Sequence, residues 1–175
     1  MAPVKTERII QALIVVCFAA LVWVIAGIFQ ERIVVAGDSA PRFSVTTEDG
    51  RTISPSNFGG KLLVVHFWAT WCPPCVTETP SLNQFQQAYA KDGVVVLGIS
   101  VDTNAKAYRD FLQRHKIAFA TSRDPDAKIA SDYGTFQYPE TYIINRDGKV
   151  LEKIISNTEW MDPERQNVIR AMLGS

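Results

Sequence analysis

The sequence has few cysteines and no excess of charge of either sign. Its 175 residues include 3 cysteines and 2 histidines, and 18 basic residues balance 18 acidic ones. Balanced, interspersed charge gives no electrostatic footprint for nucleic acid, so no nucleic-acid partner is expected. The cysteines do not suit a disulfide framework, because one lies in an apolar run and the other two are close neighbours. The length suits one ordinary domain.

An apolar run occupies residues 9–29, with Gln11 as its only polar side chain. A helix of that length spans about 30 Å, the thickness of the hydrocarbon core of a bilayer. The run therefore predicts a single transmembrane helix that anchors the chain in a membrane. A cleaved signal peptide is the alternative, but its apolar region is usually only about 7–15 residues long. Cys17 lies in the run and is interpreted as a lipid-facing or helix-packing residue.

The charges that flank this run give only a slight orientation bias. Lys5 and Arg8 precede it, while Arg32 and Arg42 follow it. We favour the amino terminus in the cytoplasm and the folded domain on the extracytoplasmic (periplasmic) face of the cytoplasmic membrane. The expected organisation is a short cytoplasmic segment at 1–8, the anchor at 9–29, a linker at 30–40 and one folded domain at 41–175.

The rest of the chain alternates strand and helix patterns. Residues 62–68 are continuously apolar, which is typical of a strand buried on both faces of a helix-covered sheet. Strand, helix, strand, helix predicts parallel strands, whereas Asp49-Gly50 and Arg146-Asp147-Gly148 predict hairpin turns. The fold class is therefore α/β, with a central sheet flanked by helices. The expected elements are an N-terminal β-hairpin at 45–53, strands at 62–68, 94–99, 141–145 and 149–155, and helices at 76–90, 104–116, 127–133 and 163–173.

Cys72 and Cys75 lie directly after the strand expected at 62–68, at the start of a helix. Free backbone N–H groups and the helix dipole there favour a negative charge such as a thiolate. Pro73 and Pro74 suit a first helical turn but remove two backbone donors. The spacing brings the two Cα atoms to about 5–6 Å, within the range of a disulfide. The pair predicts a redox centre in which Cys72 is the nucleophile and Cys75 the resolving thiol.

Two other interpretations of the pair are open. A structural zinc site needs about four ligands, but beyond the pair only His66 and His115 offer further nitrogen ligands, and there is no second cysteine pair. A static disulfide is the other, although C-x-x-C between a buried strand and a helix is a rather specific redox pattern. His115 is interpreted as structural. We expect no metal site, and no cofactor, since no nicotinamide or flavin motif is visible.

The run Phe67-Trp68-Ala69-Thr70-Trp71-Cys72-Pro73-Pro74-Cys75 closely resembles the thioredoxin superfamily, specifically its membrane-anchored TlpA/ResA/CcmG-like thiol-disulfide oxidoreductases. The resemblance covers the chain from about Pro41 to its end. It implies a thioredoxin-like fold with a mixed sheet, working outside the cytoplasmic membrane. Several members reduce the haem-binding cysteines of apocytochrome c, so the resemblance implies a protein disulfide as substrate. A reductant in an oxidising compartment must be recharged, so a transmembrane electron donor is the second expected partner.

A second match is Tyr138-Pro139-Glu140-Thr141-Tyr142. The resemblance implies that Pro139 is cis and lies beside the cysteine pair, where the backbone of Tyr138 can pair with an extended substrate. An X-Pro bond alone is cis in only about 5–6% of cases, so the family carries this prediction. The Pro-Glu-Thr run resembles the cytochrome-maturation members and makes Glu140 a candidate for partner recognition. A solvated charge at a strand end is the alternative for Glu140.

Three more residues near the cysteines are candidates. Glu78 matches an acidic residue near the active site of family members and can accept or return a proton at Cys75. The alternative is a first-turn glutamate favoured by the helix dipole. His66 departs from the family; it can exchange protons with Cys75 or stabilise a thiolate as a cation, unless it is a hydrogen-bonded core residue. Trp71 is expected to form an apolar rim around the sulfur, and Trp68 to belong to the core.

The leading prediction is a membrane-anchored enzyme that reduces disulfides of extracytoplasmic proteins. A general extracytoplasmic disulfide reductase is one alternative. A copper-delivery metallochaperone is another, since two thiolates are good ligands for Cu(I). A peroxidase is disfavoured, because its threonine-x-x-cysteine arrangement does not occur at Cys72.

Overall fold

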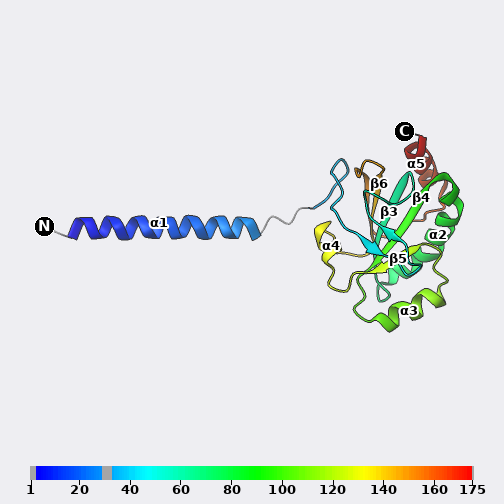
Figure 1. Ribbon diagram of the computed structural model, residues 1–175, viewed down its shortest axis with the longest axis horizontal. Helices are drawn as coiled ribbons and strands as arrows, with labels where there is room; N and C mark the ends of the chain where they lie inside the picture. The colour runs from blue at the N-terminus through cyan, green and yellow to red at the C-terminus, as the bar shows by residue number, and fades with distance from the viewer. Residues whose placement is uncertain (1–2, 29–32, 175) are drawn as a thin grey trace. The chain divides into compact units, whose positions relative to one another are not determined.

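The structure is a computed structural model that describes residues 3–28 and 33–174, and the chain divides into two compact units at the boundary between residues 32 and 33. The first unit contains one helix, α1 (Pro3–Ile28) (Figure 1). Within the described part of the chain, α1 alone is long and apolar enough to cross a membrane, with a mean hydropathy of 2.0 over Glu7–Val24. A signal sequence near an amino terminus meets the same criterion. Residue 29 of the predicted anchor and residues 30–32 of the predicted linker lie outside the described residues.

The second unit is built on a five-stranded sheet in the order β5-β4-β3-β6-β7. β3 (Leu62–Trp68) lies at the centre, parallel to β4 (Val94–Ser100) and antiparallel to β6 (Glu140–Asn145). β5 (Ala120–Arg123) is parallel to β4, and β7 (Val150–Ile155) is antiparallel to β6. The sheet is thus mixed, as expected. All 7 residues of β3 are buried, which confirms the prediction of a strand covered on both faces.

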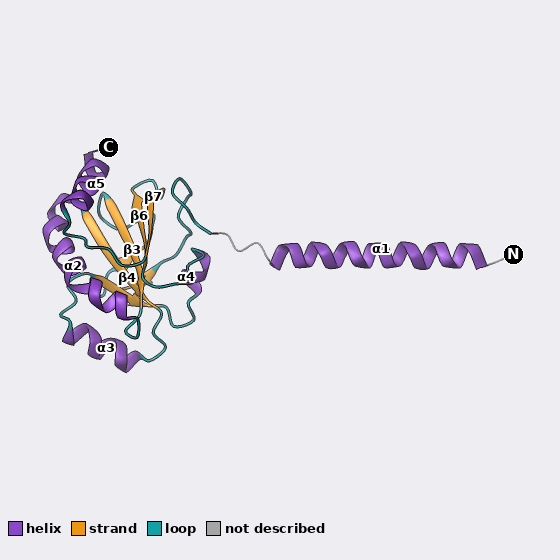
Figure 2. Cartoon of the chain, turned by 180° about the vertical axis from the view of Figure 1, so that it is seen from behind, coloured by secondary structure: helices purple, strands orange, loops and turns teal. Residues whose placement is uncertain are grey.

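Helices cover both faces of this sheet. Side chains along a strand alternate between faces, so residues 63, 65 and 67 of β3 point into one layer and residues 62 and 64 into the other. The first layer contains α3 (Ala105–Arg114) and α4 (Lys128–Asp132). The second contains α2 (Pro73–Tyr89) and α5 (Pro163–Gly174). Figure 2 shows α2 and α5 together on one side of the strands and α4 on the other.

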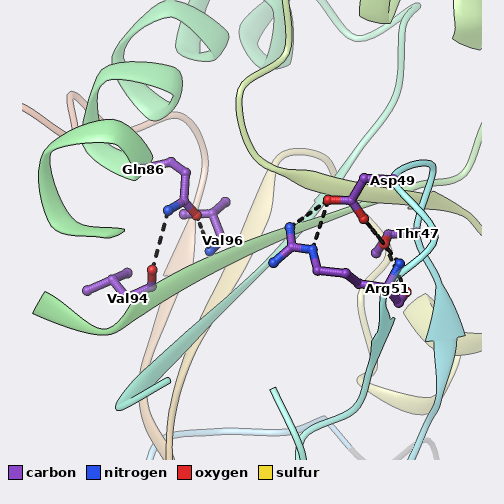
Figure 3. A network of polar contacts seen from close by, with 6 residues as sticks. All are labelled: Thr47, Asp49, Arg51, Gln86, Val94 and Val96. Carbon is purple, nitrogen blue, oxygen red and sulfur yellow. Dashed lines mark hydrogen bonds and ion pairs between the residues drawn. The ribbon is translucent and has the colours of Figure 1, made fainter. Parts of the chain in front are cut away.

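The predicted N-terminal hairpin is confirmed. β1 (Val45–Thr46) and β2 (Thr52–Ile53) are antiparallel, and Gly50 in the turn has a φ of 83°. The turn is closed by Asp49, whose carboxylate accepts hydrogen bonds from the Thr47 hydroxyl and from Arg51 Nε (Figure 3).

The described part of the predicted linker 30–40 packs on the second unit. Val34 is 1% exposed, and its N–H donates to the Tyr133 carbonyl at 3.2 Å. Gly37 N–H donates to the Val150 carbonyl at 2.8 Å, so this segment runs beside the start of β7. The compact unit therefore begins at residue 33, earlier than the boundary expected at 41.

The other predicted elements agree with the structure within a few residues, and β5 is the strand that the sequence did not predict. β5 has only 4 residues, Ala120-Thr121-Ser122-Arg123, without an apolar run. Its pairing with β4 makes it a strand. The 3₁₀-helix η1 (Ala90–Asp92) was also not predicted. α2 begins at Pro73 rather than at residue 76, because the two prolines take up its first turn.

Gln86 of α2 completes the edge of β4 that β5 leaves open. β5 pairs with β4 only from Leu97 onward, so the earlier part of β4 lacks a neighbour on that side. Gln86 Oε1 accepts from Val96 N–H at 2.7 Å, and Gln86 Nε2 donates to the Val94 carbonyl at 3.3 Å (Figure 3). The helix that follows the cysteines is thereby tied to the central sheet.

Replacing Gln86 with alanine should lower the free energy of unfolding by about 1–2 kcal/mol, because the partly buried Val96 N–H and Val94 carbonyl lose their partner. Urea unfolding of the full-length protein in detergent measures the change. Gln87→Ala, at an exposed position of the same helix, is the matched control and should change the stability by less than about 0.5 kcal/mol. Equal losses in the two variants would contradict the assigned role of Gln86.

Candidate active site

Cys72 and Cys75 form a disulfide at the amino-terminal end of α2, with an S–S distance of 2.09 Å and a Cα–Cα distance of 5.3 Å. Cys72 is the N-cap residue, and Pro73 and Pro74 occupy the first helical turn. Cys75 N–H points to Cys72 Sγ at 3.3 Å, so a backbone donor remains at this sulfur despite the prolines. Cys72 is 4% exposed and Cys75 1%. The helix end and this N–H both favour a thiolate at Cys72 in the reduced protein.

A buried carboxylate, Asp102, fixes the loop that leads from β3 to Cys72. Trp68 of β3 lies opposite Ser100 of β4, so Thr70 and Asp102 follow at matching positions beyond the two strands. Asp102 accepts from Thr70 N–H at 2.9 Å, from the Thr70 hydroxyl at 2.6 Å and from the Ser100 hydroxyl at 2.6 Å. Asp102 is not among the site residues predicted from the sequence. The sequence signal that could have identified Asp102 is its position: it is an acidic residue just after the strand that runs parallel to the strand leading to the cysteines.

The Tyr138–Pro139 peptide bond is cis, as the resemblance implied. The rings of Trp71 and Tyr138 meet edge to face with centroids 6.0 Å apart, which places the loop before β6 beside the segment that leads to Cys72. Trp71 is 64% exposed, and Phe136 in the same loop is 75% exposed. Exposed aromatic surface therefore adjoins the cysteine segment, and its contact with a substrate stays a prediction.

Glu140, the first residue of β6, is 1% exposed and is therefore not a solvated charge at a strand end. Its Oε1 accepts hydrogen bonds from the hydroxyls of Thr135, at 3.0 Å, and Tyr142. The same oxygen lies 2.8 Å from Lys153 Nζ, which also lies 5.2 Å from the centroid of the Tyr142 ring. Glu140 thus belongs to a buried polar network on the same sheet face as its cross-strand neighbour Phe67. Its role in partner recognition stays a prediction.

His66 lies in the middle of β3 and is 2% exposed, with Nδ1 2.9 Å from the Thr141 hydroxyl on β6. Burial lowers the pKa of His66 from 6.5 to about 3, so the ring is neutral at neutral pH. The structure therefore shows a hydrogen-bonded core histidine. Stabilisation of a thiolate by a His66 cation would require a pH far below neutral. Proton exchange with Cys75 stays a prediction.

Glu78 lies one turn after Cys75 on α2 and is 3% exposed. Trp160 Nε1 donates to Glu78 Oε1 at 2.5 Å, while Oε2 is buried without a hydrogen-bond partner. Burial raises the pKa of Glu78 from 4.5 to about 7; the Trp160 hydrogen bond and the Thr158 backbone N–H oppose this shift, and Glu159 adds to it. A carboxyl group with this pKa can accept and return a proton near neutral pH. Glu78 lies beyond the first helical turn, which excludes the alternative of a first-turn glutamate.

The remaining titratable candidates lie elsewhere. Cys17 is a free, exposed cysteine of α1. His115 stacks on Phe111 with ring centroids 4.0 Å apart, which agrees with a structural role. Within residues 3–28 and 33–174, no group of three or more histidine, cysteine, aspartate or glutamate side chains is placed to hold a metal ion.

Comparison with known proteins gives the family. A model of the AhpC/TSA family matches residues 36–153. The thiol-disulfide oxidoreductase ResA of Geobacillus thermodenitrificans is 31% identical over 168 residues, which cover 94% of this chain and 96% of that protein. ResA of Bacillus thuringiensis subsp. konkukian is 32% identical over 143 residues, with coverages of 81% and 83%. The chain belongs to the AhpC/TSA family, as a ResA-type thiol-disulfide oxidoreductase.

Solved structures confirm the thioredoxin-like fold of this oxidoreductase. A thioredoxin-family thiol:disulfide interchange protein from Chlorobium tepidum TLS is 27% identical with a TM-score of 0.66, covering 79% of this chain and 99% of its own. StoA from Bacillus subtilis is 26% identical with a TM-score of 0.61 and coverages of 68% and 90%. These relatives favour the redox interpretation of Cys72 and Cys75 over a zinc site or a static disulfide.

Glu78 should make the stability of the oxidoreductase depend on pH. Its pKa is about 7 in the folded protein, against 4.5 for an unperturbed glutamate, so between these values the folded state binds more protons than the unfolded state. Stability therefore falls as the pH rises through this window, and the loss is complete above the folded pKa. The shift corresponds to a loss of about 3 kcal/mol.

Urea unfolding of the oxidised wild type and of Glu78→Gln, between about pH 4 and about pH 9, isolates this contribution. As the pH rises, the wild type should lose stability relative to Glu78→Gln. Glu164→Gln, at an exposed position of α5, should follow the wild-type curve. Parallel curves for wild type and Glu78→Gln would show that this carboxyl group titrates alike in both states.

Proposed function

We propose that this oxidoreductase reduces disulfides of extracytoplasmic proteins while anchored in the cytoplasmic membrane by residues 9–29. The observation that carries the proposal is the Cys72–Cys75 disulfide at the start of α2, in a domain that follows a helix able to span a bilayer. Residues 1–8 would lie in the cytoplasm and the folded domain on the periplasmic face. The charges that flank the helix support this orientation only slightly.

The reaction transfers two electrons from the enzyme dithiol to the substrate disulfide. The Cys72 thiolate attacks one substrate sulfur, which forms a mixed disulfide and releases the other substrate sulfur as a thiolate that takes a proton from solvent. The Cys75 thiol passes its proton to the Glu78 carboxylate and attacks Cys72 Sγ. The Cys72–Cys75 bond forms, the bond between Cys72 and the substrate sulfur breaks, and this sulfur leaves as a thiolate that takes a proton from solvent. The short Cα–Cα distance of 5.3 Å lets this bond close without a large backbone movement.

The surface around the disulfide suits an extended polypeptide segment. Trp71 and Tyr138 present aromatic surface beside Cys72. The Pro139 carbonyl accepts from Ser156 N–H at 3.0 Å, so the residue that follows β7 holds the end of the loop that carries Tyr138. We assign the backbone of Tyr138 to pairing with the substrate. Glu140, buried behind this loop, would act on recognition by holding the loop in place.

The substrate class is a protein disulfide, which follows from the family. Within that class we propose the haem-binding cysteines of apocytochrome c, which the resemblance to the cytochrome-maturation members implies. A reductant in an oxidising compartment has to be recharged, so the Cys72–Cys75 disulfide would be reduced by a transmembrane electron donor.

Changing Cys75 to serine should trap the mixed disulfide through Cys72, because the resolving thiol is gone. Changing Cys72 to serine should abolish capture. Both variants are compared in the native membrane by non-reducing electrophoresis, and the captured protein is identified by mass spectrometry of the reduced adduct. Apocytochrome c, linked through its haem-binding cysteines, is the expected adduct.

All these variants should carry Cys17→Ser, since Cys17 is free and exposed and would add unrelated adducts. Capture by the Cys72→Ser variant and not by the Cys75→Ser variant would reverse the assigned roles. Capture of many different proteins, without apocytochrome c among them, would contradict the proposed substrate and indicate a general disulfide reductase. A reduction potential close to that of a disulfide oxidase would contradict the assignment as a reductase.

A further inference from the structure

Trp160 reaches the active-site helix from the loop between β7 and α5, 82 residues after Glu78. Its side chain is 0% exposed and belongs to the core layer between the sheet, α2 and α5. The indole packs on Phe85 of α2 with ring centroids 4.9 Å apart. Close packing on all sides holds the direction of its N–H, which is aimed at the Glu78 carboxyl group.

The backbone of the same loop is also fixed to α2. Trp160 N–H donates to Ser81 Oγ at 3.4 Å, and the Ser81 hydroxyl lies 3.1 Å from the Glu78 carbonyl. The Ser81 hydroxyl also lies 3.5 Å from the Thr158 carbonyl. Both the side chain and the main chain at Trp160 are therefore aligned with the helical turn that carries Glu78.

The hydrogen bond makes the two oxygens of Glu78 different. An indole N–H is a donor only, so Glu78 Oε1 has to act as an acceptor whether the carboxyl group is ionised or neutral. The proton of the neutral acid then belongs on Oε2. This oxygen is buried and has no close hydrogen-bond partner among the described residues, while the backbone N–H of Thr158 acts on the same carboxyl group and favours its ionised form. Oε2 can therefore accept a group that arrives during the reaction. A buried polar atom without a partner is costly, so its presence calls for an explanation.

Other polar and charged groups also lie around Glu78. The backbone N–H of Thr158, in the Trp160 loop, favours the ionised form of Glu78, whereas Glu159 in the same loop acts through space and favours the neutral acid. Cys75 lies one turn earlier on α2. His66 of β3 also faces this side of the sheet, and burial keeps it neutral. Arg165 of α5 pairs with Glu152 at 2.8 Å, and Arg170 of α5 donates to the Tyr89 hydroxyl at 3.1 Å.

We propose that Trp160 is a positioning residue of the oxidoreductase, whose indole N–H holds Glu78 Oε1 and thereby presents Oε2 as the oxygen that exchanges a proton with the Cys75 thiol. The inference rests on the proposed function, in which Glu78 serves Cys75. In this step the S–H bond of Cys75 breaks, an O–H bond forms at Oε2, and the thiolate attacks Cys72 Sγ. The proton returns by the reverse path when the disulfide is reduced.

The resolving step can be followed directly. The reduced full-length protein, with Cys17→Ser, is mixed in detergent with a symmetrical aromatic disulfide whose released thiolate is coloured. The first thiolate appears when Cys72 forms the mixed disulfide, and the second appears when Cys75 displaces the remaining aromatic thiolate. The rate of the second phase is measured as a function of pH.

Trp160→Phe keeps a ring against Phe85 and removes the five-membered ring that carries the N–H donor. A hydrogen bond to the ionised carboxylate favours that form, so its loss should raise the midpoint of the pH profile by about one unit. Below both midpoints the second phase should be about ten-fold slower than in the wild type. Trp68→Phe is the matched control, because Trp68 Nε1 is buried without a hydrogen-bond partner, and its midpoint should not move.

Glu78→Gln should abolish the dependence on pH near neutrality, and the double variant Trp160→Phe, Glu78→Gln should match Glu78→Gln alone. A second measurement uses wild-type side chains, so it does not depend on the folding of Trp160→Phe. The indole N–H resonance of Trp160, followed by NMR, should titrate with the midpoint of the second phase. That titration should vanish in Glu78→Gln, and the Trp68 resonance should show none.

An unchanged midpoint in Trp160→Phe, or a Trp160 resonance that does not respond to pH, would overturn the inference. The proposed function would still stand in that case if Cys75→Ser captures its substrate and Glu78→Gln alters the profile. A profile that Glu78→Gln leaves unchanged would overturn the proton-transfer role of Glu78 and this inference together. Failure of capture by Cys75→Ser would instead count against the proposed substrate reaction.

Discussion

The redox site depends on the packing of α2 against the central sheet, with the amino terminus of that helix at the end of the buried strand β3. Phe85 and other apolar residues of α2 hold the helix on the sheet, and Gln86 bonds it to the edge of β4. This placement puts Cys72 at the N-cap and Cys75 in the first turn. Stabilisation of a thiolate and closure of the disulfide are thus two results of the same helix position.

The same packing sets the protonation of the two buried groups on that side of the sheet. Burial disfavours a charge of either sign, so it raises the pKa of Glu78 to about 7 and lowers that of His66 to about 3. One desolvating environment therefore gives a carboxyl group that titrates near neutral pH and an imidazole that does not. Of these two groups, only Glu78 has a pKa near neutral, as the proposed proton transfer with Cys75 requires.

Much of the fold could be predicted from the sequence because its signals are local. The apolar run of β3, the Asp49-Gly50 turn and the cysteine spacing are properties of neighbouring residues, and the structure agrees with each. β5 was missed because its four residues carry no pattern of their own and depend on pairing with β4. The early start of the compact unit was missed for a similar reason, since Val34 is held by a hydrogen bond to Tyr133, far along the chain.

The site divides in the same way between local and distant residues. The cysteine motif fixes the chemistry within a few positions, and the family resemblance adds the cis bond before Pro139. Asp102, which secures the loop before Cys72, and Trp160, which bonds to Glu78, come from other elements. Only the position of Asp102 just after a parallel strand could have pointed to it, and Trp160 has no sequence pattern that links it to the cysteines. A short motif can therefore indicate thiol exchange. The residues that orient the loop before Cys72 and the Glu78 carboxyl group are recognised only in the structure, where the fold brings distant segments together.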